Sequence, residues 1–510
     1  MKAFRFPIVL LLVLIVTTLF SPPAHAYEFC VSDASQLQAA LSTATTNGED
    51  NTIRIVQGTY VGHFVYLSTQ PSSLTILGGY TASCASRTIE PENTVLDGQN
   101  TGHVLTIGDT STTDIALTIE GLTFQNGTGT GVVLNWNNGS VAVRSSVIRN
   151  NAGTYGGGMW VKLGFGSVSV LGSDFLTNTA NGYGAGLRIN GAGPVEVIIM
   201  ENVFNGNYTS AYGGGGLCVS IETSAPLSVV NNLFVNNSSP WGGGALIGGI
   251  GGVARVANNT FAGNLTTGCG GGMALAHYQE ATIANDIYWN NQAVSGSDLC
   301  FSDVPVAAVN MIANDLDQSA TGVSGLSGFV FDPSNFNKLD PQFVNMELED
   351  FHLQAASPCV DSGNLAVVPL PATDIEGLPR VVNAVVDMGA YEYQGTLPPP
   401  GSDLFGLLNE FHYYKAEERV TTIFELVNGG TSARAFTAAC YISSTAAKLG
   451  TLVDSVRLKR GLASAASKAV TCAFSSAESL SGKYLQLVID PDNSVWESDE
   501  TNNRVILRIP

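Results

Sequence analysis

A short phrase recurs six times between residues 121 and 301, and it constrains the fold of this chain more than any other feature. Each copy has an aromatic or aliphatic residue, an asparagine three places later, and then a glycine cluster that ends in an apolar residue. One repeat of this length has too little apolar surface to fold alone, so the period predicts a stacked solenoid. The copies begin 27, 29, 30, 27 and 27 residues apart, at Ile148/Asn151, Phe175/Asn178, Phe204/Asn207, Phe234/Asn237, Phe261/Asn264 and Tyr288/Asn291.

Strand-like segments follow one another along the first part of the chain without helices between them. Residues 53–56, 73–77 and 104–107 alternate apolar and polar side chains between glycine, proline and asparagine turns. The lack of crossover helices excludes a doubly wound α/β fold and leaves a sandwich, a barrel or a parallel β-helix. The repeat favours a right-handed parallel β-helix. Residues 33–44 have helical spacing, and we expect this short helix to cover the open end of the first coil.

In such a solenoid, equivalent residues of successive coils stand about 4.8 Å apart, so sequence columns become stacks. The phenylalanines should form one stack, and the asparagines three residues later should form a hydrogen-bonded ladder. Two more columns should fill the interior: Met159, Leu187, Leu217, Ala245 and Met273, and then Val161, Ile189, Val219, Ile247 and Leu275.

The charge balance limits the partners. The chain has 42 acidic and 22 basic residues and a net charge of −20, which argues against a nucleic-acid ligand, because phosphates are bound with Lys and Arg. Residues 1–26 read as a cleaved signal peptide, with Lys2 and Arg5 before an apolar run, and no later segment predicts an integral membrane span. We therefore expect an exported protein, either extracellular or on a bacterial cell surface.

Eight scattered cysteines in an exported chain indicate disulfides rather than a metal site. Three pairs are expected: Cys30–Cys84 at the N-terminal end, Cys440–Cys472 near the C-terminus, and Cys269–Cys300 within the repeats. This assignment leaves Cys218 and Cys359 unpaired.

The repeated phrases carry a family resemblance. Residues 234–237 (FVNN) with 243–246 (GGAL) resemble the repeats of polymorphic outer-membrane proteins, which are surface β-helix adhesins. Residues 78–87 (GGYTASCASR) and 93–98 (NTVLDG) look like the broad group of secreted, pectin-lyase-like parallel β-helix proteins. The last residues show no series of amphipathic strands like the barrel of an autotransporter, so self-insertion into an outer membrane is not implied.

The remainder of the chain divides into three parts. Residues 339–393 resemble a choice-of-anchor Q segment, which implies closing coils and a C-terminal cap for a β-helix domain spanning 27–394. Residues 395–403 are a proline-rich linker. Residues 404–510 alternate like the strands of an immunoglobulin-like β-sandwich, and their ending (YLQLVIDPDNSVWESDETNNRVILRI) resembles the cell-adhesion-related CARDB module.

Catalytic chemistry is hard to place on this scaffold. A polysaccharide lyase or glycoside hydrolase needs carboxylates and a base gathered on adjacent coils. The two columns expected to point outward contain no carboxylate, and Arg188 beside Lys162 is their only basic pair: Trp160, Arg188, Cys218, Leu246 and Ala274, and Lys162, Asn190, Ser220, Gly248 and Ala276. No catalytic residue is assigned. The enzyme alternative places its site on the less regular coils, around residues 52–126 or 304–350. Asp97, Asp109 and Asp114 could form a small cluster there, although each is also typical of a turn.

Four aromatic residues form the candidate ligand site: Tyr155, Tyr183, Tyr212 and Trp241, each just before a glycine cluster. Regularly spaced rings along one edge suit stacking on sugars or packing against a partner protein, although they could also be lids over the glycine turns. The favoured reading is a non-catalytic, surface-associated, adhesin-like or carbohydrate-binding monomer whose partner is a polysaccharide or a cell-surface protein.

No cofactor or metal site is assigned, although calcium has one candidate location. Acidic residues crowd a turn near the C-terminus, and such clustered oxygen ligands suit calcium. Their spacing does not match a calcium loop, and turn chemistry accounts for them equally: Asp490, Asp492, Glu497, Asp499 and Glu500.

Overall fold

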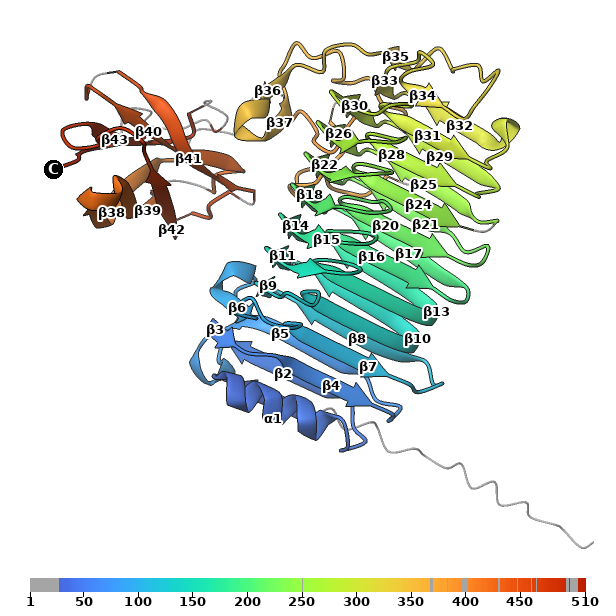
Figure 1. The fold of residues 1–510 in the computed structure, drawn as a ribbon, viewed down its shortest axis with the longest axis horizontal. Helices are drawn as coiled ribbons and strands as arrows, with labels where there is room; N and C mark the ends of the chain where they lie inside the picture. Colours follow the sequence, from blue (N-terminus) through green and yellow to red (C-terminus); the bar gives the residue numbers. More distant parts are fainter. Residues whose placement is uncertain are drawn as a thin grey trace, which may run out of the picture.

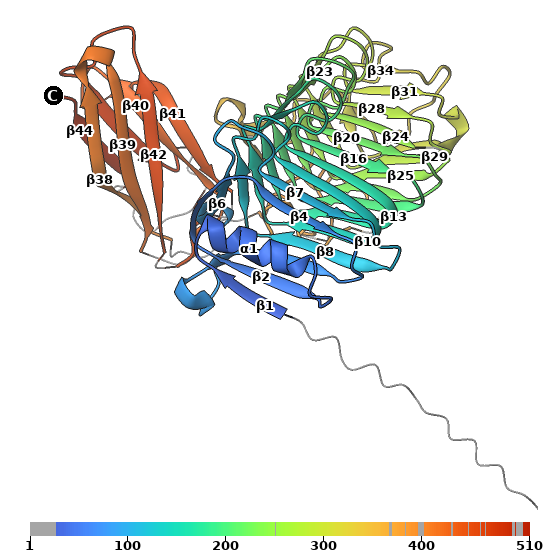
Figure 2. The same ribbon diagram turned by 60° about the horizontal axis from the view of Figure 1, so that its bottom comes forward.

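The computed structural model describes residues 27–510 apart from 250, 367–369, 383, 396–401, 430–431, 447, 460, 465, 492–494 and 496–502. The predicted signal peptide therefore lies outside the described residues. The described chain forms a parallel β-solenoid followed by a β-sandwich that stands beside it (Figures 1 and 2).

Parallel strands of successive coils build the solenoid, which confirms the stacked architecture predicted from the repeat. The largest sheet has 19 strands, and two long strands, β10 (Val132–Arg144) and β13 (Met159–Leu171), each pair with two shorter strands of a neighbouring coil. Its other strands are β1 (Tyr27–Val31), β2 (Asn51–Val56), β4 (Phe64–Ser68), β5 (Leu74–Tyr80), β7 (Leu105–Asp109), β8 (Ile115–Glu120), β16 (Leu187–Gly191), β17 (Val195–Met200), β20 (Leu217–Ile221), β21 (Leu227–Val230), β24 (Ala245–Gly249), β25 (Val253–Ala257), β28 (Met273–Ala276), β29 (Glu280–Ala284), β31 (Leu299–Ser302), β32 (Val309–Ile312) and β34 (Val323–Ser324).

Two further parallel sheets run along the solenoid, and the smaller one spans only five of its coils. The 11-stranded sheet consists of β3 (Gly58–Val61), β6 (Thr94–Asp97), β9 (Thr123–Gln125), β11 (Val147–Arg149), β14 (Asp174–Leu176), β18 (Val203–Asn205), β22 (Leu233–Val235), β26 (Thr260–Ala262), β30 (Ile287–Trp289), β33 (Asp315–Leu316) and β35 (Phe336–Asn337). The five-stranded sheet consists of β12 (Ala152–Gly153), β15 (Thr179–Ala180), β19 (Tyr208–Thr209), β23 (Ser238–Ser239) and β27 (Leu265–Thr266).

The predicted stacks are present in the core. Phe175, Phe204, Phe234, Phe261 and Tyr288 stack face to face with ring centroids 4.6–4.9 Å apart. The two interior columns are buried and lie in the expected register. Because these rings and aliphatic side chains form one continuous apolar cluster, each coil depends on its neighbours for burial.

The predicted asparagine ladder is confirmed, and a second ladder lies beside it. In the first, each amide nitrogen donates to the next amide oxygen over 2.9–3.1 Å, from Asn151 through Asn178, Asn207, Asn237 and Asn264 to Asn291. The second comprises Asn202, Asn232, Asn259, Asp286, Asn314 and Asn335. Sequence reasoning missed it, although a polar residue recurs two places before each ring and could have revealed it.

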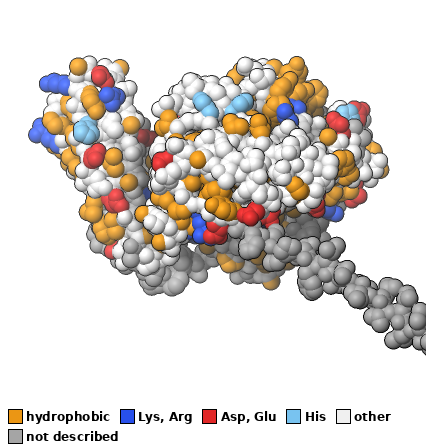
Figure 3. All heavy atoms as spheres, turned by 90° about the horizontal axis from the view of Figure 1, so that it is seen from below, with side chains coloured by type: hydrophobic (Ala, Val, Ile, Leu, Met, Phe, Trp, Pro, Cys, Tyr) orange, Lys and Arg blue, Asp and Glu red, His pale blue; other side chains and the backbone are white. Residues whose placement is uncertain are grey.

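Helix α1 (Ala34–Ala44) lies across the N-terminal end of the solenoid (Figure 1). Asp33 caps it by accepting a 2.8 Å hydrogen bond from the Gln36 backbone N–H. The buried face, which includes Leu37 and Leu41, joins the solenoid core. Figure 3 views this end of the molecule and shows charged side chains scattered singly over the solenoid, without a continuous basic patch.

Residues 339–393 differ from the closing coils expected in the sequence. Strands β36 (Phe343–Asn345) and β37 (Asp350–Leu353) pair antiparallel, and the following residues run back along the side of the solenoid. We call the described part of residues 355–393 the lateral segment. It buries an outward apolar strip of the coils under its own apolar residues: Val203, Leu233, Val235, Ala262, Ile287 and Ala313 under Cys359, Met388, Ala390 and Tyr391.

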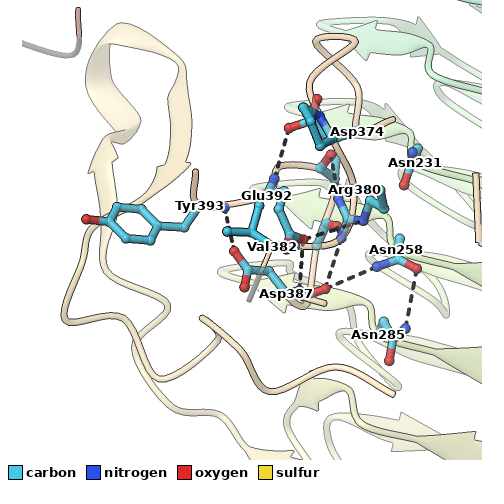
Figure 4. A network of polar contacts seen from close by, with 12 residues as sticks. Asn231, Asn258, Asn285, Asp374, Arg380, Val382, Asp387, Glu392 and Tyr393 are labelled. Carbon is cyan, nitrogen blue, oxygen red and sulfur yellow. Dashed lines mark hydrogen bonds and ion pairs between the residues drawn. The ribbon is translucent and has the colours of Figure 1, made fainter. Parts of the chain in front are cut away.

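Polar contacts hold the lateral segment in place (Figure 4). Asn231, Asn258 and Asn285 occupy equivalent left-handed turns of three coils, and their amides donate to Thr373, Asp387 and Asn364 carbonyls. The fully buried Arg380 guanidinium donates to the carbonyls of Ala390, Asp387 and Gly389, so it ties the segment to itself. The lateral segment packs on the side of existing coils and adds no coil of its own, so it does not need the repeat pattern.

The C-terminal part is a two-layer sandwich with its own apolar core. One antiparallel sheet contains β38 (Leu404–Tyr414), β39 (Arg419–Asn428) and β42 (Ser467–Ser475); the other contains β41 (Thr451–Leu458), β40 (Phe436–Ser443), β43 (Tyr484–Ile489) and β44 (Arg504–Arg508). Short 3-10 turns occur at Ala82–Cys84, Pro91–Asn93, Val306–Ala308, Met346–Leu348 and Lys415–Glu417. Most of the predicted linker lies outside the described residues.

Ion pairs hold the sandwich against the solenoid at three levels. Lys468 lies 2.9 Å from Glu90 near the N-terminal coils, and Lys459 lies 3.4 Å from Asp174 farther along. Arg457 inserts beside β37, where its Nη1 donates to Asp350 Oδ2 over 3.0 Å.

The three expected disulfides are present: Cys30–Cys84, Cys269–Cys300 and Cys440–Cys472. Cys218 and Cys359 are free, as the pairing predicted, and both are buried. Among the described residues, we find no helix with the length and apolarity that a membrane crossing requires.

Candidate functional site

The strand register confirms the two residue columns beside the glycine turns, and within them Cys218 and Ala274 are buried. Trp160 pairs with Arg188 and then Cys218, while Lys162 pairs with Asn190 and then Ser220. The next coils continue these columns with Leu246 and Gly248, and then Ala274 and Ala276. This face of the solenoid therefore carries two cations and no carboxylate in either column, as predicted.

Three of the four candidate aromatic residues occupy equivalent positions, and the fourth is displaced. Backbone hydrogen bonds link the carbonyls of Tyr183, Gly213 and Trp241 to glycine amides of preceding coils. Tyr155 stands four residues before its strand, as Tyr183 and Trp241 do, whereas Tyr212 lies one residue earlier with a backbone φ of +65°. Gly213 therefore interrupts the predicted aromatic line.

Side-chain contacts nevertheless bring three of these residues together. Tyr183 stacks on Tyr212 with ring centroids 4.6 Å apart, and Tyr155 lies 5.3 Å from Trp160. The Arg188 guanidinium lies over both Tyr155 and Tyr183, at 5.1 and 4.5 Å from their ring centroids. Within the described structure, no ring contact joins Trp241 to this group.

The same side chains are held by a shared hydrogen-bond acceptor. Asn190 Oδ1 accepts from Arg188 Nε over 2.6 Å and from Trp160 Nε1 over 2.9 Å. Lys162 Nζ sits 3.6 Å from the centroid of the Trp160 ring. We call these seven residues the aromatic–cation cluster: Tyr155, Trp160, Lys162, Tyr183, Arg188, Asn190 and Tyr212.

The exposed fractions of the side chains show which could meet a ligand. Tyr212 is 57% exposed, Trp241 45% and Tyr155 36%. Trp160, Lys162, Tyr183 and Arg188 are half-buried. Tyr155 also covers Gly182, since a Cβ there would lie 2.8 Å from its ring, so Tyr155 has a structural role. Tyr212 and Trp241 have the largest exposed surfaces of the predicted four.

No counter-charge accompanies the two cations. Neither Lys162 nor Arg188 forms an ion pair with any described residue. Burial, and secondarily the nearby Arg188, lowers the pKa of Lys162. Burial raises the pKa of the Cys218 thiol to about 11, so this neighbour of Arg188 stays uncharged at neutral pH.

Sequence reasoning identified the tyrosines and the cations separately but did not join them. The two groups come together because the Arg188 side chain contacts Tyr183 on the turn of its own coil and Tyr155 on the turn of the coil before it. The alignment of Trp160 with Arg188 in one column could have indicated this grouping.

The carboxylates considered for hydrolysis do not gather. Asp97 ends β6 in the 11-stranded sheet, whereas Asp109 ends β7 in the 19-stranded sheet. Although burial opposes it, hydrogen bonds from Gln125, Gln99 and Asn126 keep the pKa of Asp97 below its usual value. Burial raises the pKa of Asp109, whose Oδ1 accepts from the Ser111 amide, and Asp114 lies in the loop after it. These are turn contacts rather than an acid and base pair.

The calcium candidate is mostly outside the described residues, which omit Asp492, Glu497, Asp499 and Glu500. Asp490 Oδ2 accepts from the Val495 amide. In the part of the chain that the structure describes, no three His, Cys, Asp or Glu side chains come close enough together to hold a metal ion.

Comparison with known proteins identifies the C-terminal part. The CARDB family model matches residues 412–506. A search of curated proteins found no match to the chain. The resemblance of the solenoid to polymorphic outer-membrane and pectin-lyase-like proteins stays a prediction. Together with the disulfides, the match suggests an extracellular protein: the chain is a parallel β-solenoid that carries a C-terminal CARDB domain, a domain type related to cell adhesion.

Proposed function

We propose that this protein is exported and surface-associated, and that it binds carbohydrate as a non-catalytic, adhesin-like monomer. The solenoid is the display surface, and the CARDB domain serves attachment or interaction. The adhesion-related family match and the three disulfides support this assignment.

The observation that carries the proposal is the set of exposed rings on neighbouring coils. Tyr212 and Trp241 are about half exposed, although each stands on a turn whose backbone is hydrogen-bonded to the coils on either side. Aromatic faces held on a rigid scaffold stack on sugar rings with little loss of conformational entropy. A structural lid needs no such exposure, which favours a ligand platform for these two residues.

A glycan array tests the proposal with the double variant Tyr212→Asn/Trp241→Ala. Asparagine suits position 212 because it tolerates the left-handed conformation there. We expect the wild-type protein to bind a subset of glycans, and the variant to bind them at least tenfold more weakly with an unchanged melting temperature. Phe165→Ala is the matched control, because Phe165 is also an exposed ring but lies at the middle of β13, outside the candidate aromatic set.

Two results would contradict this function. Unchanged glycan and cell-surface binding together with a lowered melting temperature would make the rings structural lids. New reducing or unsaturated chain ends released from a polysaccharide panel would make the protein an enzyme.

A further inference from the structure

We propose that the aromatic–cation cluster binds uronic acid residues of an anionic polysaccharide, with Arg188 and Lys162 pairing with sugar carboxylates and the neighbouring rings stacking on sugar faces. This inference rests on the proposed carbohydrate-binding function and names the class of carbohydrate.

The Arg188 guanidinium is already oriented for an anion. Its Nε is committed to Asn190 Oδ1, and the Tyr155 and Tyr183 rings hold its plane from two coils. Its Nη1 is buried and has no hydrogen-bond partner among the described residues. A buried donor without a partner is costly, and a carboxylate accepts hydrogen bonds from such a guanidinium in a fixed fork.

Lys162 supplies a second positive charge on the preceding coil. It lies one coil and two residues from Arg188 along the register, and its ammonium rests on the Trp160 ring. Cation–ring contacts orient both side chains but do not neutralise them. Two like charges this close repel each other, so an anion placed between them removes that repulsion.

The residues that flank the two cations on the neighbouring coils supply no counter-charge. Acidic residues outnumber basic ones by 42 to 22, yet the two outward columns around Lys162 and Arg188 contain none of them. Cys218, the next residue in the Arg188 column, is a neutral thiol. The surroundings are therefore complementary to an external anion.

The arrangement of rings favours a sugar polymer over an acidic peptide. Tyr155, Tyr183 and Tyr212 lie on three successive coils, and Lys162 and Arg188 lie on the first two of them. Successive coils are about 4.8 Å apart. This spacing is comparable with the length of one pyranose ring, so a polysaccharide lying along the axis presents successive rings and carboxylates to successive coils. Tyr212, stacked on Tyr183 and 57% exposed, extends the platform beyond the charged pair.

Binding of matched polymers to the full chain tests the inference. Polygalacturonate and its fully methyl-esterified form have the same backbone, but only the first carries carboxylates. We expect the wild type to bind polygalacturonate at least tenfold more tightly than the ester, with an affinity that falls as salt rises. Lys162→Met and Arg188→Met should each lose most of this preference for polygalacturonate over the ester.

Arg255→Met is the matched control, because Arg255 is exposed on the same sheet, on β25, outside the cluster. If Arg188→Met fails to fold, the half-buried Lys162→Met still tests the charge.

Equal wild-type binding of the ester and the acid, or an unchanged preference in Lys162→Met, would overturn the inference and leave the proposed function standing. Binding of neither polymer, nor of any glycan on the array, would remove the proposed function itself. Binding of polyglutamate as tightly as polygalacturonate would point to an acidic protein partner and also overturn it.

Discussion

Asp286 occupies a ladder position that asparagine fills in the coils before and after it. Its Oδ1 accepts from the Asn259 backbone N–H over 2.6 Å and from the Asn259 amide over 2.9 Å. The carboxyl is completely buried, and burial raises its pKa to about 8. The folded protein therefore keeps a proton on Asp286 at pH values where an unfolded chain has lost it.

This protonation predicts a pH-dependent stability. An unfolded Asp has a pKa of about 3.9, so between roughly pH 4 and pH 8 the native state binds one proton more than the unfolded state. The contribution of Asp286 is thus greatest below pH 4 and declines as pH rises through this window. Asp286→Asn keeps the shape and is neutral at every pH. We expect it to stabilise the solenoid by about 2 kcal/mol or more at pH 8 and by little at pH 4.

Thermal unfolding of the wild type and Asp286→Asn at pH 4, 6 and 8 measures this difference. Asp114→Asn is the control, since it removes a carboxylate from an exposed loop. An advantage of Asp286→Asn that is equal at all three pH values would show that the carboxyl ionises in the folded state as it does in the unfolded chain.

At the scale of the element, the glycine turn before strands β13, β16, β20, β24, β28 and β31 is the feature that repeats most strictly. A glycine three residues before the strand has a φ between +58° and +79° in six successive coils: Gly156, Gly184, Gly214, Gly242, Gly270 and Gly296. A Cβ at Gly242 would also lie 2.4 Å from the Ala245 carbonyl oxygen. Both the conformation and the space at this turn therefore require glycine.

Two alanine substitutions separate these requirements. Gly206 has nearly the same φ, +65°, but a Cβ there would meet only a Thr177 methyl group at 3.4 Å. Gly206→Ala should lower the free energy of unfolding by about 1–2 kcal/mol, the cost of the left-handed conformation for a residue with a Cβ. Gly242→Ala adds the clash, so we expect about 2–5 kcal/mol in total. Melting temperatures of the two variants compare them, and equal losses would mean that the turn relaxes around the new Cβ.

At the scale of the whole molecule, one buried contact dominates the placement of the sandwich against the solenoid. Arg457 bonds Asp350 and lies 3.7 Å from Glu376, in a site where all three side chains are nearly inaccessible. His352 lies between the same two carboxylates, and although burial opposes its charge, Glu376 and Asp350 raise its pKa to about 9. Lys459 and Lys468 pair at the partly exposed edge of the interface, where such pairs contribute about 0–1 kcal/mol.

Arg457→Met should therefore release the sandwich, because it breaks the hydrogen bond to Asp350 and leaves two buried carboxylates with protonated His352 as their remaining cation. Breaking a buried pair of this kind costs up to about 3–5 kcal/mol. Small-angle X-ray scattering should show an increased maximum dimension for this variant. The double variant Lys459→Met/Lys468→Met removes the exposed pairs and should scatter like the wild type. If the double variant opened the molecule and Arg457→Met did not, the exposed pairs would hold the interface.

The local repeat could be read directly from the sequence. The period, the Phe stack, the first asparagine ladder, the inward columns and the three disulfides all follow from residues at fixed spacing, since each coil repeats the environment of the last. The CARDB-like ending was recognisable for a similar reason, because its short tail is specific. The exposed aromatic residues were also identified, although Tyr212 falls one residue out of the column.

The rest of the structure depends on contacts between residues that lie outside the repeat or at unrelated positions of it. The lateral segment folds back over an apolar strip of the coils, and Arg457 reaches Asp350 across 107 residues of sequence. The grouping of Tyr155, Tyr183 and Arg188 depends on side-chain directions across neighbouring coils rather than on spacing. The sequence alone thus determined the solenoid, because its information is local and repeated. Only the tertiary structure decided which surface strips are covered and which cations are left without a partner, because burial and charge pairing depend on the whole arrangement of the chain.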